Sequence, residues 1–187
     1  MNIKKLFPGL LFRLFSLILI IIISAYLSIS ITSCDNRRRV IKIGNQAALS
    51  GEYESFGEDQ LVSIRLAAEK LSPVRIGGFD YEIEIITKDD EGNPEKAFLA
   101  AQEMINEEVA GVIGSTFNGT TEVSIPVYEE YGVPVVSPSA QKTELSGLGD
   151  NFFRLVINST QKVENIALFI KNKINPQRLI LMNNREE

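Results

Sequence analysis

Three short segments of the chain concentrate small residues and hydrogen-bond donors. They are residues 48–57, 114–121 and 136–141. Glycine lets a backbone approach a ligand closely, and hydroxyl and free backbone N–H groups donate hydrogen bonds. A helix that begins in such a segment adds a partial positive charge. The segments therefore suit a small carboxylate, although on composition alone helix caps and turns are the commoner reason for these residue types.

The same segments lack the groups that most enzymes need. The chain has no histidine, its only cysteine is Cys34, and neither a Gly-x-Ser-x-Gly nor a Gly-x-Gly-x-x-Gly motif is present. No serine or threonine in the three segments therefore has a histidine as partner base. We expect a binding protein that has no catalytic residues and needs no cofactor.

The charge of the chain limits the classes of binding partner. The formal net charge is -5, and the only basic cluster is Arg37, Arg38 and Arg39. Nucleic-acid binding needs an extended basic surface, so we expect no nucleic-acid partner. Asp89, Asp90 and Glu91 could offer oxygen ligands to calcium or magnesium. They directly precede a helix start at Asn93 and Pro94, where acidic residues are favourable for structural reasons, and we expect no metal.

Short apolar runs alternate with amphipathic stretches along the mature chain. Strands are predicted at 40–47, 81–88, 109–113, 133–136, 152–156 and 178–182, and helices at 57–70, from 93 onward, at 121–131 and at 159–173. The predicted core faces are Leu61, Ile64, Leu66, Ala67, Ala68 and Leu71 in the first helix, and Ala97, Phe98, Ala101, Met104 and Ile105 in the second. Strands that alternate with helices give an α/β fold, here a doubly wound, mainly parallel sheet with helices on both faces. The carboxyl ends of such strands are where ligands bind.

The N-terminus has the pattern of an export signal. Lys4, Lys5 and Arg13 precede an uncharged, Leu- and Ile-rich run from residue 14 to Cys34. Its end, Ile31-Thr32-Ser33-Cys34, resembles the lipobox of bacterial lipoproteins, which implies a signal peptide over 1–33, a diacylglycerol on the Cys34 sulfur and a spacer over 34–39. The alternative is a transmembrane anchor, because a run of this length can span a hydrocarbon core of about 30 Å. Both interpretations place the mature chain outside the cytoplasm.

Several motifs occur in an order that resembles a known family. They are Leu49-Ser50-Gly51, Phe56-Gly57, Asp89-Asp90 before Pro94, Val112 to Ser115, and Pro134 to Ala140. This pattern is similar to the leucine/isoleucine/valine-binding proteins of ABC importers, which have the type I periplasmic-binding-protein fold. The resemblance implies a first ligand-binding lobe over 40–154 and an incomplete start of a second lobe over 155–187.

The resemblance also assigns roles to individual positions. Phe56 matches the aromatic residue that lines the pocket for the ligand's side chain. Asn118, followed by Gly119, stands where a serine usually lies near the carboxylate. Ser139 and Ala140 belong to the loop whose backbone contacts the ligand, and Gln141 replaces the usual threonine or serine. Both replacements can still donate hydrogen bonds, but they leave the branched-chain specificity open.

The expected function is that of a lipid-anchored solute-binding protein outside the cytoplasm. It would capture a branched-chain or related amino acid by its carboxylate between two lobes and deliver it to an ABC permease in the membrane. The alternatives are a ligand-sensing receptor domain of the same fold and a non-functional fragment. One lobe leaves a face of the ligand in water, so we expect this chain alone to bind at about millimolar strength.

Overall fold

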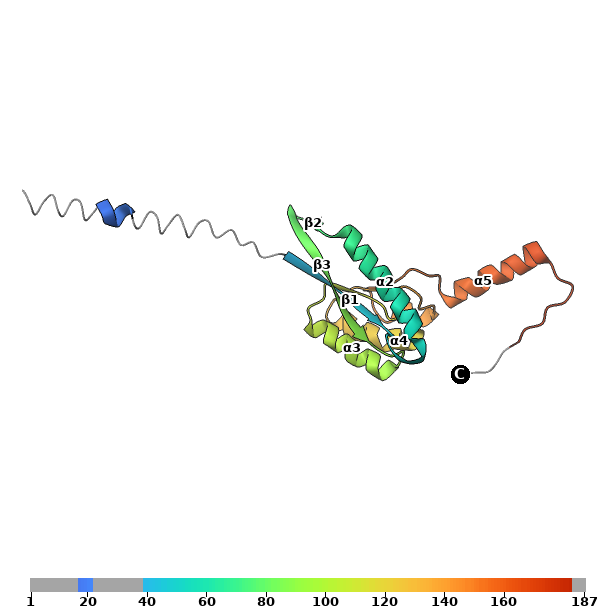
Figure 1. The fold of residues 1–187 in the computed structure, drawn as a ribbon. Helices are drawn as coiled ribbons and strands as arrows, with labels where there is room; N and C mark the ends of the chain where they lie inside the picture. The colour runs from blue at the N-terminus through green and yellow to red at the C-terminus, as the bar shows by residue number, and fades with distance from the viewer. Residues whose placement is uncertain (1–16, 22–38, 183–187) are drawn as a thin grey trace, which may run out of the picture. The chain divides into compact units, whose positions relative to one another are not determined.

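The structure is a computed structural model of the 187-residue chain, and it describes residues 17–21 and 39–182 (Figure 1). Residues 1–38 and 39–187 are separate units. In the first unit, residues 17–21 are helical and exposed, whereas Cys34 and the remainder of the predicted signal segment and spacer up to Arg38 lie outside the described residues. No helix within the described ranges is long and apolar enough to cross a membrane.

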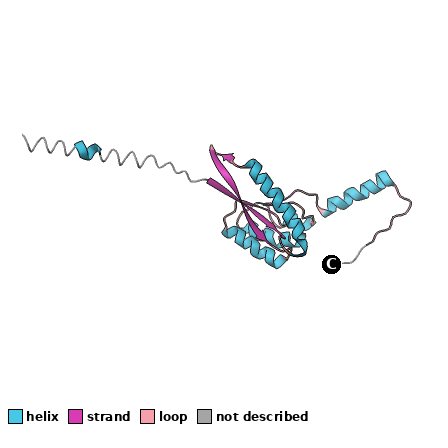
Figure 2. Ribbon diagram, in the orientation of Figure 1, coloured by secondary structure: helices cyan, strands magenta, loops and turns pink. Residues whose placement is uncertain are grey.

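The second unit is built on one sheet. Its strands are β1 (Arg39–Ala47), β2 (Val74–Ile76), β3 (Phe79–Asp89), β4 (Gly111–Ile113), β5 (Val135–Ser137) and β6 (Phe152–Arg154). They are ordered β2-β3-β1-β4-β5-β6, and every neighbouring pair is parallel except β2 with β3 (Figure 2). The predicted mainly parallel sheet is confirmed.

Helices cover both faces of this sheet, as predicted. Their bounds are α2 (Glu54–Leu71), α3 (Pro94–Asn106), α4 (Asn118–Glu130) and α5 (Ser159–Phe169), with short 3-10 turns η2 (Gly51–Tyr53) and η3 (Thr143–Gly147) and a π-helical turn η4 (Ile170–Ile174). Ile43 of β1 faces the α2 side, whereas a side chain on its neighbour Gly44 would meet Met104 of α3. Helix α2 therefore lies on one face, and α3 packs beside α4 on the other (Figure 1).

The hydrophobic core lies between the sheet and the α3–α4 pair. Its main cluster comprises Ala101, Met104, Val109, Val112, Val127, Tyr128 and Val135. Small alanines at positions 97, 100 and 101 let α3 approach α4 and the sheet closely. Phe98, predicted to face the sheet, is instead 43% exposed, because the buried face of α3 runs through positions 97, 100, 101 and 104.

The face covered by α2 is less enclosed. Of the apolar stripe predicted to be buried on this helix, Ile64 is buried, whereas Leu66 and Leu71 are 49% and 63% exposed. Two helices cover one side of the sheet and α2 the other, so part of the α2 stripe borders an open groove rather than a packed layer. The broad buried stripe predicted for α2 is therefore wrong in extent.

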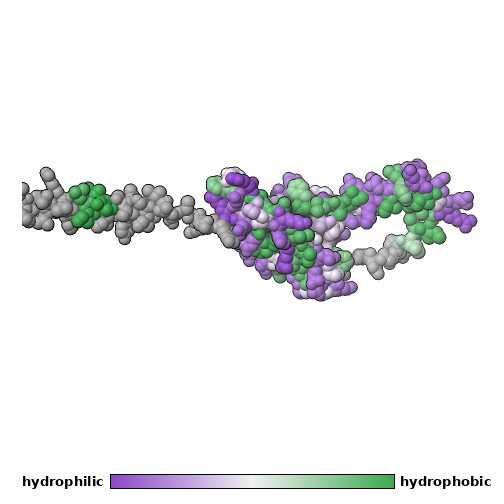
Figure 3. Space-filling model, turned by 45° about the horizontal axis from the view of Figure 1, so that its top comes forward, coloured by the Kyte–Doolittle hydropathy of each residue, from purple (hydrophilic) through white to green (hydrophobic). Residues whose placement is uncertain are grey.

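Two features at the ends of the fold differ from the sequence expectation. The short β2 was not predicted; it pairs with β3 through a tight turn at Gly77 and Gly78, both with positive φ, a geometry typical of a two-residue hairpin. The strand predicted at 178–182 is not formed. Those residues have no regular secondary structure and are exposed, because a lone strand without a hydrogen-bonding neighbour is not stable. Figure 3 shows hydrophobic side chains on the surface of the C-terminal segment.

Candidate functional site

The loops that follow the parallel strands gather at one edge of the sheet. From β1 the chain passes through α2 to β3 on one side, and from β3 through α3 to β4 on the other. The strand order therefore reverses between β1 and β4, and such switch points are where open α/β sheets bind ligands. The segments at this edge are residues 48–53, 90–93, 114–117 and 138–142. They include part of each of the three segments that the sequence singled out.

Asn118 joins two of these loops. Its side-chain Oδ1 accepts hydrogen bonds from the backbone N–H groups of Gln141 at 2.8 Å and Lys142 at 2.9 Å. Nearby, the Ser139 hydroxyl donates to the backbone oxygen of Thr116 at 2.5 Å. Asn118, Ser139 and Gln141 therefore lie on two adjoining loops, although the carbonyl oxygen of Asn118 faces the second loop.

The N-terminus of α4 begins beside this contact. Phe117 precedes the helix, and no side chain among the described residues caps it. Gly119 in the first turn is exposed, and a Cβ added there would meet only Pro94 Cγ, at 3.5 Å. The first N–H groups of a helix have no partner within the helix and carry partial positive charge. This end of α4 can therefore receive an anion.

An aromatic cluster borders the same loops. The ring of Phe117 lies 4.7 Å from that of Tyr53 and 5.9 Å from that of Phe56, measured between centroids. Phe56 is 58% exposed, so the cluster offers an apolar surface to solvent beside the polar loops. The sequence analysis named Phe56 but missed Tyr53 and Phe117 as its partners.

Gln60 of α2 forms hydrogen bonds to both strands at the switch point. Its Nε2 donates to Asn45 Oδ1 at 2.8 Å, to the backbone oxygen of Gln46 at 3.1 Å and to that of Ile113 at 3.3 Å. Its Oε1 accepts from the hydroxyl of Thr116 at 3.1 Å. One amide thus ties α2 to the ends of β1 and β4. The sequence analysis missed this role, because the sequence pattern does not distinguish Gln60 from any other polar residue on a helix surface.

Asp90 is a buried acceptor that connects the loops to β1. Its carboxylate is fully buried and accepts from the Ser115 hydroxyl at 2.7 Å, from Gly92 N–H at 3.0 Å and from Gln46 Nε2 at 3.4 Å. The Tyr128 hydroxyl donates to Oε1 of the same Gln46 side chain at 2.6 Å. Burial disfavours the charged carboxylate and raises the pKa of Asp90, although the hydrogen bonds oppose that effect.

Asp89 fixes the first loop. It accepts from Leu49 N–H at 2.7 Å, from the Ser50 hydroxyl at 2.6 Å and from Glu91 N–H at 2.8 Å. Burial alone would raise the pKa of Asp89, but these donors together lower it. Both aspartates thus accept hydrogen bonds from their own turn and from neighbouring segments. Within residues 17–21 and 39–182, no group of three or more acidic, cysteine or histidine side chains could hold a metal ion.

The side chain of Ala140 lies beneath the loop that contains Ser139 and Gln141. Its side chain is 1% exposed and packs with Ile125 and Leu145. Its backbone oxygen accepts from Arg154 at 3.2 Å, and the same guanidinium holds the Lys142 oxygen at 2.9 Å. Ala140 and Arg154 therefore shape the loop that presents Ser139 and Gln141.

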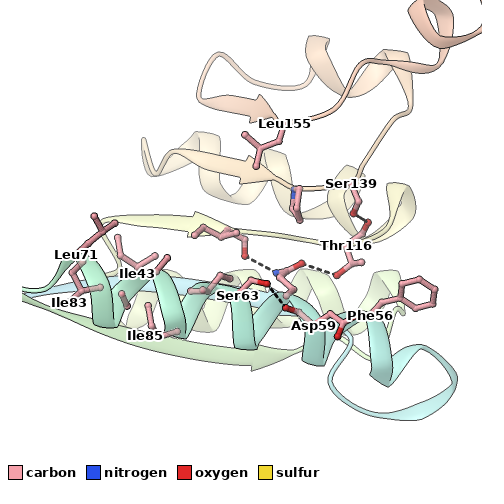
Figure 4. Close-up of a pocket in the computed structure, with 16 residues that line it drawn as sticks. Ile43, Phe56, Asp59, Ser63, Leu71, Ile83, Ile85, Thr116, Ser139 and Leu155 are labelled. Atoms are coloured by element: carbon pink, nitrogen blue, oxygen red, sulfur yellow. Dashed lines mark hydrogen bonds between the residues drawn. The ribbon is translucent and has the colours of Figure 1, made fainter.

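Two hollows adjoin the loops. An apolar groove of about 700 Å³ runs between α2 and the sheet, and Figure 4 shows Phe56, Thr116 and Ser139 at one end and Leu71 and Ile83 at the other. A second hollow of about 510 Å³ lies between Asn118 and the start of α5, and its lining is polar apart from Val163. Phe56 and Ser139 line the groove and Asn118 lines the second hollow, whereas Gly119, Ala140 and Gln141 line neither.

A doubly wound sheet whose loops gather at a switch point is the architecture of a ligand-binding lobe. The family model for the periplasmic binding protein matches residues 40–186, so the chain belongs to the periplasmic binding protein family. Members of this family are solute-binding proteins rather than enzymes.

Individual relatives agree with this assignment. The chain is 23% identical over 151 residues to the Leu/Ile/Val-binding protein of Escherichia coli strain K12, a match that covers 79% of this chain and 40% of the relative. It is 27% identical over 110 residues to a leucine-, isoleucine-, valine-, threonine- and alanine-binding protein of Pseudomonas aeruginosa, covering 58% of this chain and 29% of the relative. The chain thus spans well under half the length of these curated relatives.

Solved structures share the fold. A leucine-binding protein from Thermotoga maritima superposes with a TM-score of 0.65 at 23% identity, covering 73% of this chain and 38% of that one. A branched-chain amino acid transporter substrate-binding protein from Streptococcus pneumoniae, in complex with isoleucine, superposes with a TM-score of 0.63 at 24% identity. The match covers 73% of this chain and 39% of that one. A solute-binding protein from Rhodopseudomonas palustris in complex with 4-hydroxybenzoate gives 0.63 at 25%, covering 72% and 36%. The type I periplasmic-binding-protein fold is therefore confirmed.

Proposed function

We propose that this chain carries the first lobe of a solute-binding protein that captures a small carboxylate with an apolar body and delivers it to an ABC permease. The observation that carries the proposal is the meeting of two surfaces at the sheet edge. The uncapped start of α4 and the loop at Gln141 supply backbone N–H groups, and Phe56 with Phe117 supplies an apolar wall. A carboxylate and an apolar side chain are the two parts that these surfaces suit.

The relatives support the same ligand class. Isoleucine and 4-hydroxybenzoate, the ligands of two solved neighbours, differ in size and shape but share a carboxylate on an apolar body. We propose a branched-chain or similar amino acid as the ligand, with Phe56, Gly119, Ser139 and Gln141 contributing to its site. Because Ala140 is buried, its contribution is to hold the loop in place.

The proposal includes attachment to a membrane. A diacylglycerol on Cys34 would hold the lobe at the outer face of the cytoplasmic membrane, close to its permease. The sequence Thr32-Ser33-Cys34 supports this attachment. We infer that the lobe over 40–154 and the segment from 155 onward belong to the two halves of a binding cleft.

The experiment that tests the ligand class compares leucine with leucinamide, which lacks the carboxylate charge. Ligand-detected NMR on the full chain in mild detergent should show millimolar binding of leucine and at least about tenfold weaker binding of leucinamide, because charge-assisted hydrogen bonds are roughly twice as strong as neutral ones. Equal binding of the two compounds, or no binding of either, would refute a carboxylate site.

A further inference from the structure

Two successive backbone N–H groups converge on a single oxygen at the candidate site. Gln141 and Lys142 both donate to Asn118 Oδ1, at 2.8 and 2.9 Å, although the residues are more than twenty positions apart in the chain. We call these two N–H groups the nest, because adjacent backbone N–H groups that share one acceptor can also bind an anion or a carboxylate. Here a neutral amide oxygen of the same chain occupies the nest.

Charged side chains of both signs surround the nest, because Glu144 and Glu164 line the hollow beside Asn118 and two lysines lie close to the loop. Lys162 Nζ donates to the Gln141 side chain at 3.1 Å, which places a cation beside the loop. The ammonium of Lys142 is held by Glu122 at 2.7 Å and leaves the nest itself to the backbone donors. Asn118 is exposed, so a solute can reach it.

From this geometry we propose that Asn118 is a built-in competitor for the ligand head group and thereby sets the selectivity of the site. In the unliganded chain its carbonyl oxygen fills the nest, and a ligand carboxylate exchanges with it. The inference rests on the proposed function, since it concerns the head-group end of the same site. Asn118 then acts as a selectivity filter rather than as a donor to the carboxylate.

Competition of this kind favours charged head groups. The Asn118 oxygen is tethered to the site and is as good an acceptor as any neutral amide, so a neutral ligand gains little by replacing it. A carboxylate makes shorter and stronger hydrogen bonds to the same N–H groups and can replace it. The occupied nest therefore increases the difference in binding affinity between a carboxylic acid and its amide.

The test uses two substitutions at one position with opposite expected effects. Asn118→Ala empties the nest, and leucine should then bind about tenfold more tightly, with a smaller preference over leucinamide. Asn118→Asp places a permanent carboxylate in the nest, keeps both acceptor contacts and should abolish the leucine-induced shifts of the Gln141 and Lys142 amides. Asn106→Ala, at the end of α3, is the matched control and should bind like the wild type.

The readout is the ¹⁵N–¹H spectrum of each full-length variant during titration with leucine and leucinamide. An Asn118→Ala affinity equal to or weaker than that of the wild type would overturn the inference while leaving the proposed function intact. So would an Asn118→Asp variant that still binds leucine through these amides. Failure of the wild type to bind any carboxylate would instead refute the proposed function. Because Asn118→Asp retains both hydrogen bonds, the test holds even if Asn118→Ala folds poorly.

Discussion

Asp90 connects three segments of the candidate site. It receives hydrogen bonds from the end of β1, from the turn before α3 and from the loop after β4. A buried acceptor with several donors is costly to remove, because each donor then loses its partner in a place that water cannot reach. Asp90 therefore determines both the stability of the fold and the position of the loop that leads to Asn118.

Asp90→Ala should lower the free energy of unfolding by on the order of 3 kcal/mol. The loss should be largest below the unfolded pKa of 3.8 and shrink as the pH rises above it. Burial raises the folded-state pKa of Asp90, so its contribution to stability is fully present below the unfolded pKa and is lost as the pH rises through the folded one. Urea unfolding at several pH values measures this trend. As a control, Asp80→Ala at the exposed β2–β3 hairpin should change stability by less than about 0.5 kcal/mol, and a loss for Asp90→Ala that grows with pH would contradict the account.

Part of the site could be predicted from the residue sequence. The three polar segments could be predicted because small polar residues after apolar strands are recognisable in one dimension, whereas the roles of Asn118, Ser139 and Gln141 came from the family resemblance. The structure places Asn118 at the start of α4, in contact with the loop that contains Ser139 and Gln141. The direction of the Asn118 side-chain oxygen could not be predicted, since it depends on the relative position in space of two segments that are far apart in the chain. The burial of Ala140 was missed for a similar reason, because it depends on how η3 packs beneath the loop.

At the scale of elements, α3 and α5 have similar caps but different surroundings. Asn93 Oδ1 accepts from Glu95 N–H at 2.8 Å at the start of α3, and Asn158 Oδ1 accepts from Gln161 N–H at 2.9 Å at the start of α5. Helix α3 buries residues against the core, whereas α5 has no buried residue. The same local interaction should therefore have different consequences for the whole fold.

Asn93→Ala should lower the free energy of unfolding of the lobe by about 1 kcal/mol, the usual cost of a lost helix cap. Asn158→Ala is the matched variant. It should reduce helicity in α5 with little effect on the main unfolding transition, because α5 contains no buried residue. Chemical denaturation followed by circular dichroism distinguishes the two effects, and equal losses of global stability would show that α5 unfolds together with the core.

The elements themselves were largely predictable. Regular alternation and the Asn93-Pro94 start signal indicated β3 and α3 closely, and the sheet is parallel as expected. The exceptions have physical causes. The three-residue β2 exists because Gly77 and Gly78 reverse the chain onto β3, a pairing too short to give a periodic signal. The apolar run at 178–182 has the composition of a strand but no strand beside it.

At the scale of the whole molecule, the proposed function implies that the described lobe contacts only one side of a ligand. The relatives that it matches are considerably longer, since the match covers 40% of the Escherichia coli protein. Binding by a single lobe sacrifices the contacts and the exclusion of water that closure supplies, so millimolar rather than micromolar affinity follows. A micromolar isotherm for this chain with leucine, isoleucine or valine would contradict that expectation.

Membrane attachment is a second property of the whole chain. When the chain is expressed in a bacterial host, intact-mass spectrometry of the membrane fraction should find it beginning at Cys34 with a lipid mass added. Cys34→Ser should remain uncleaved and without lipid, because serine lacks the sulfur that carries the diacylglycerol. An uncleaved wild-type chain in the membrane would favour the transmembrane anchor instead.

The most direct test of the central claim is a map of where a carboxylate binds. Full-length ¹⁵N-labelled chain in mild detergent is titrated with leucine, and amide shifts are followed for every assigned residue. The account predicts that the largest shifts fall on Gly119, Ser139, Gln141 and Lys142, at the carboxyl edge of the sheet. Largest shifts at the far end of the α2 groove, around Leu71 and Ile83, would contradict it.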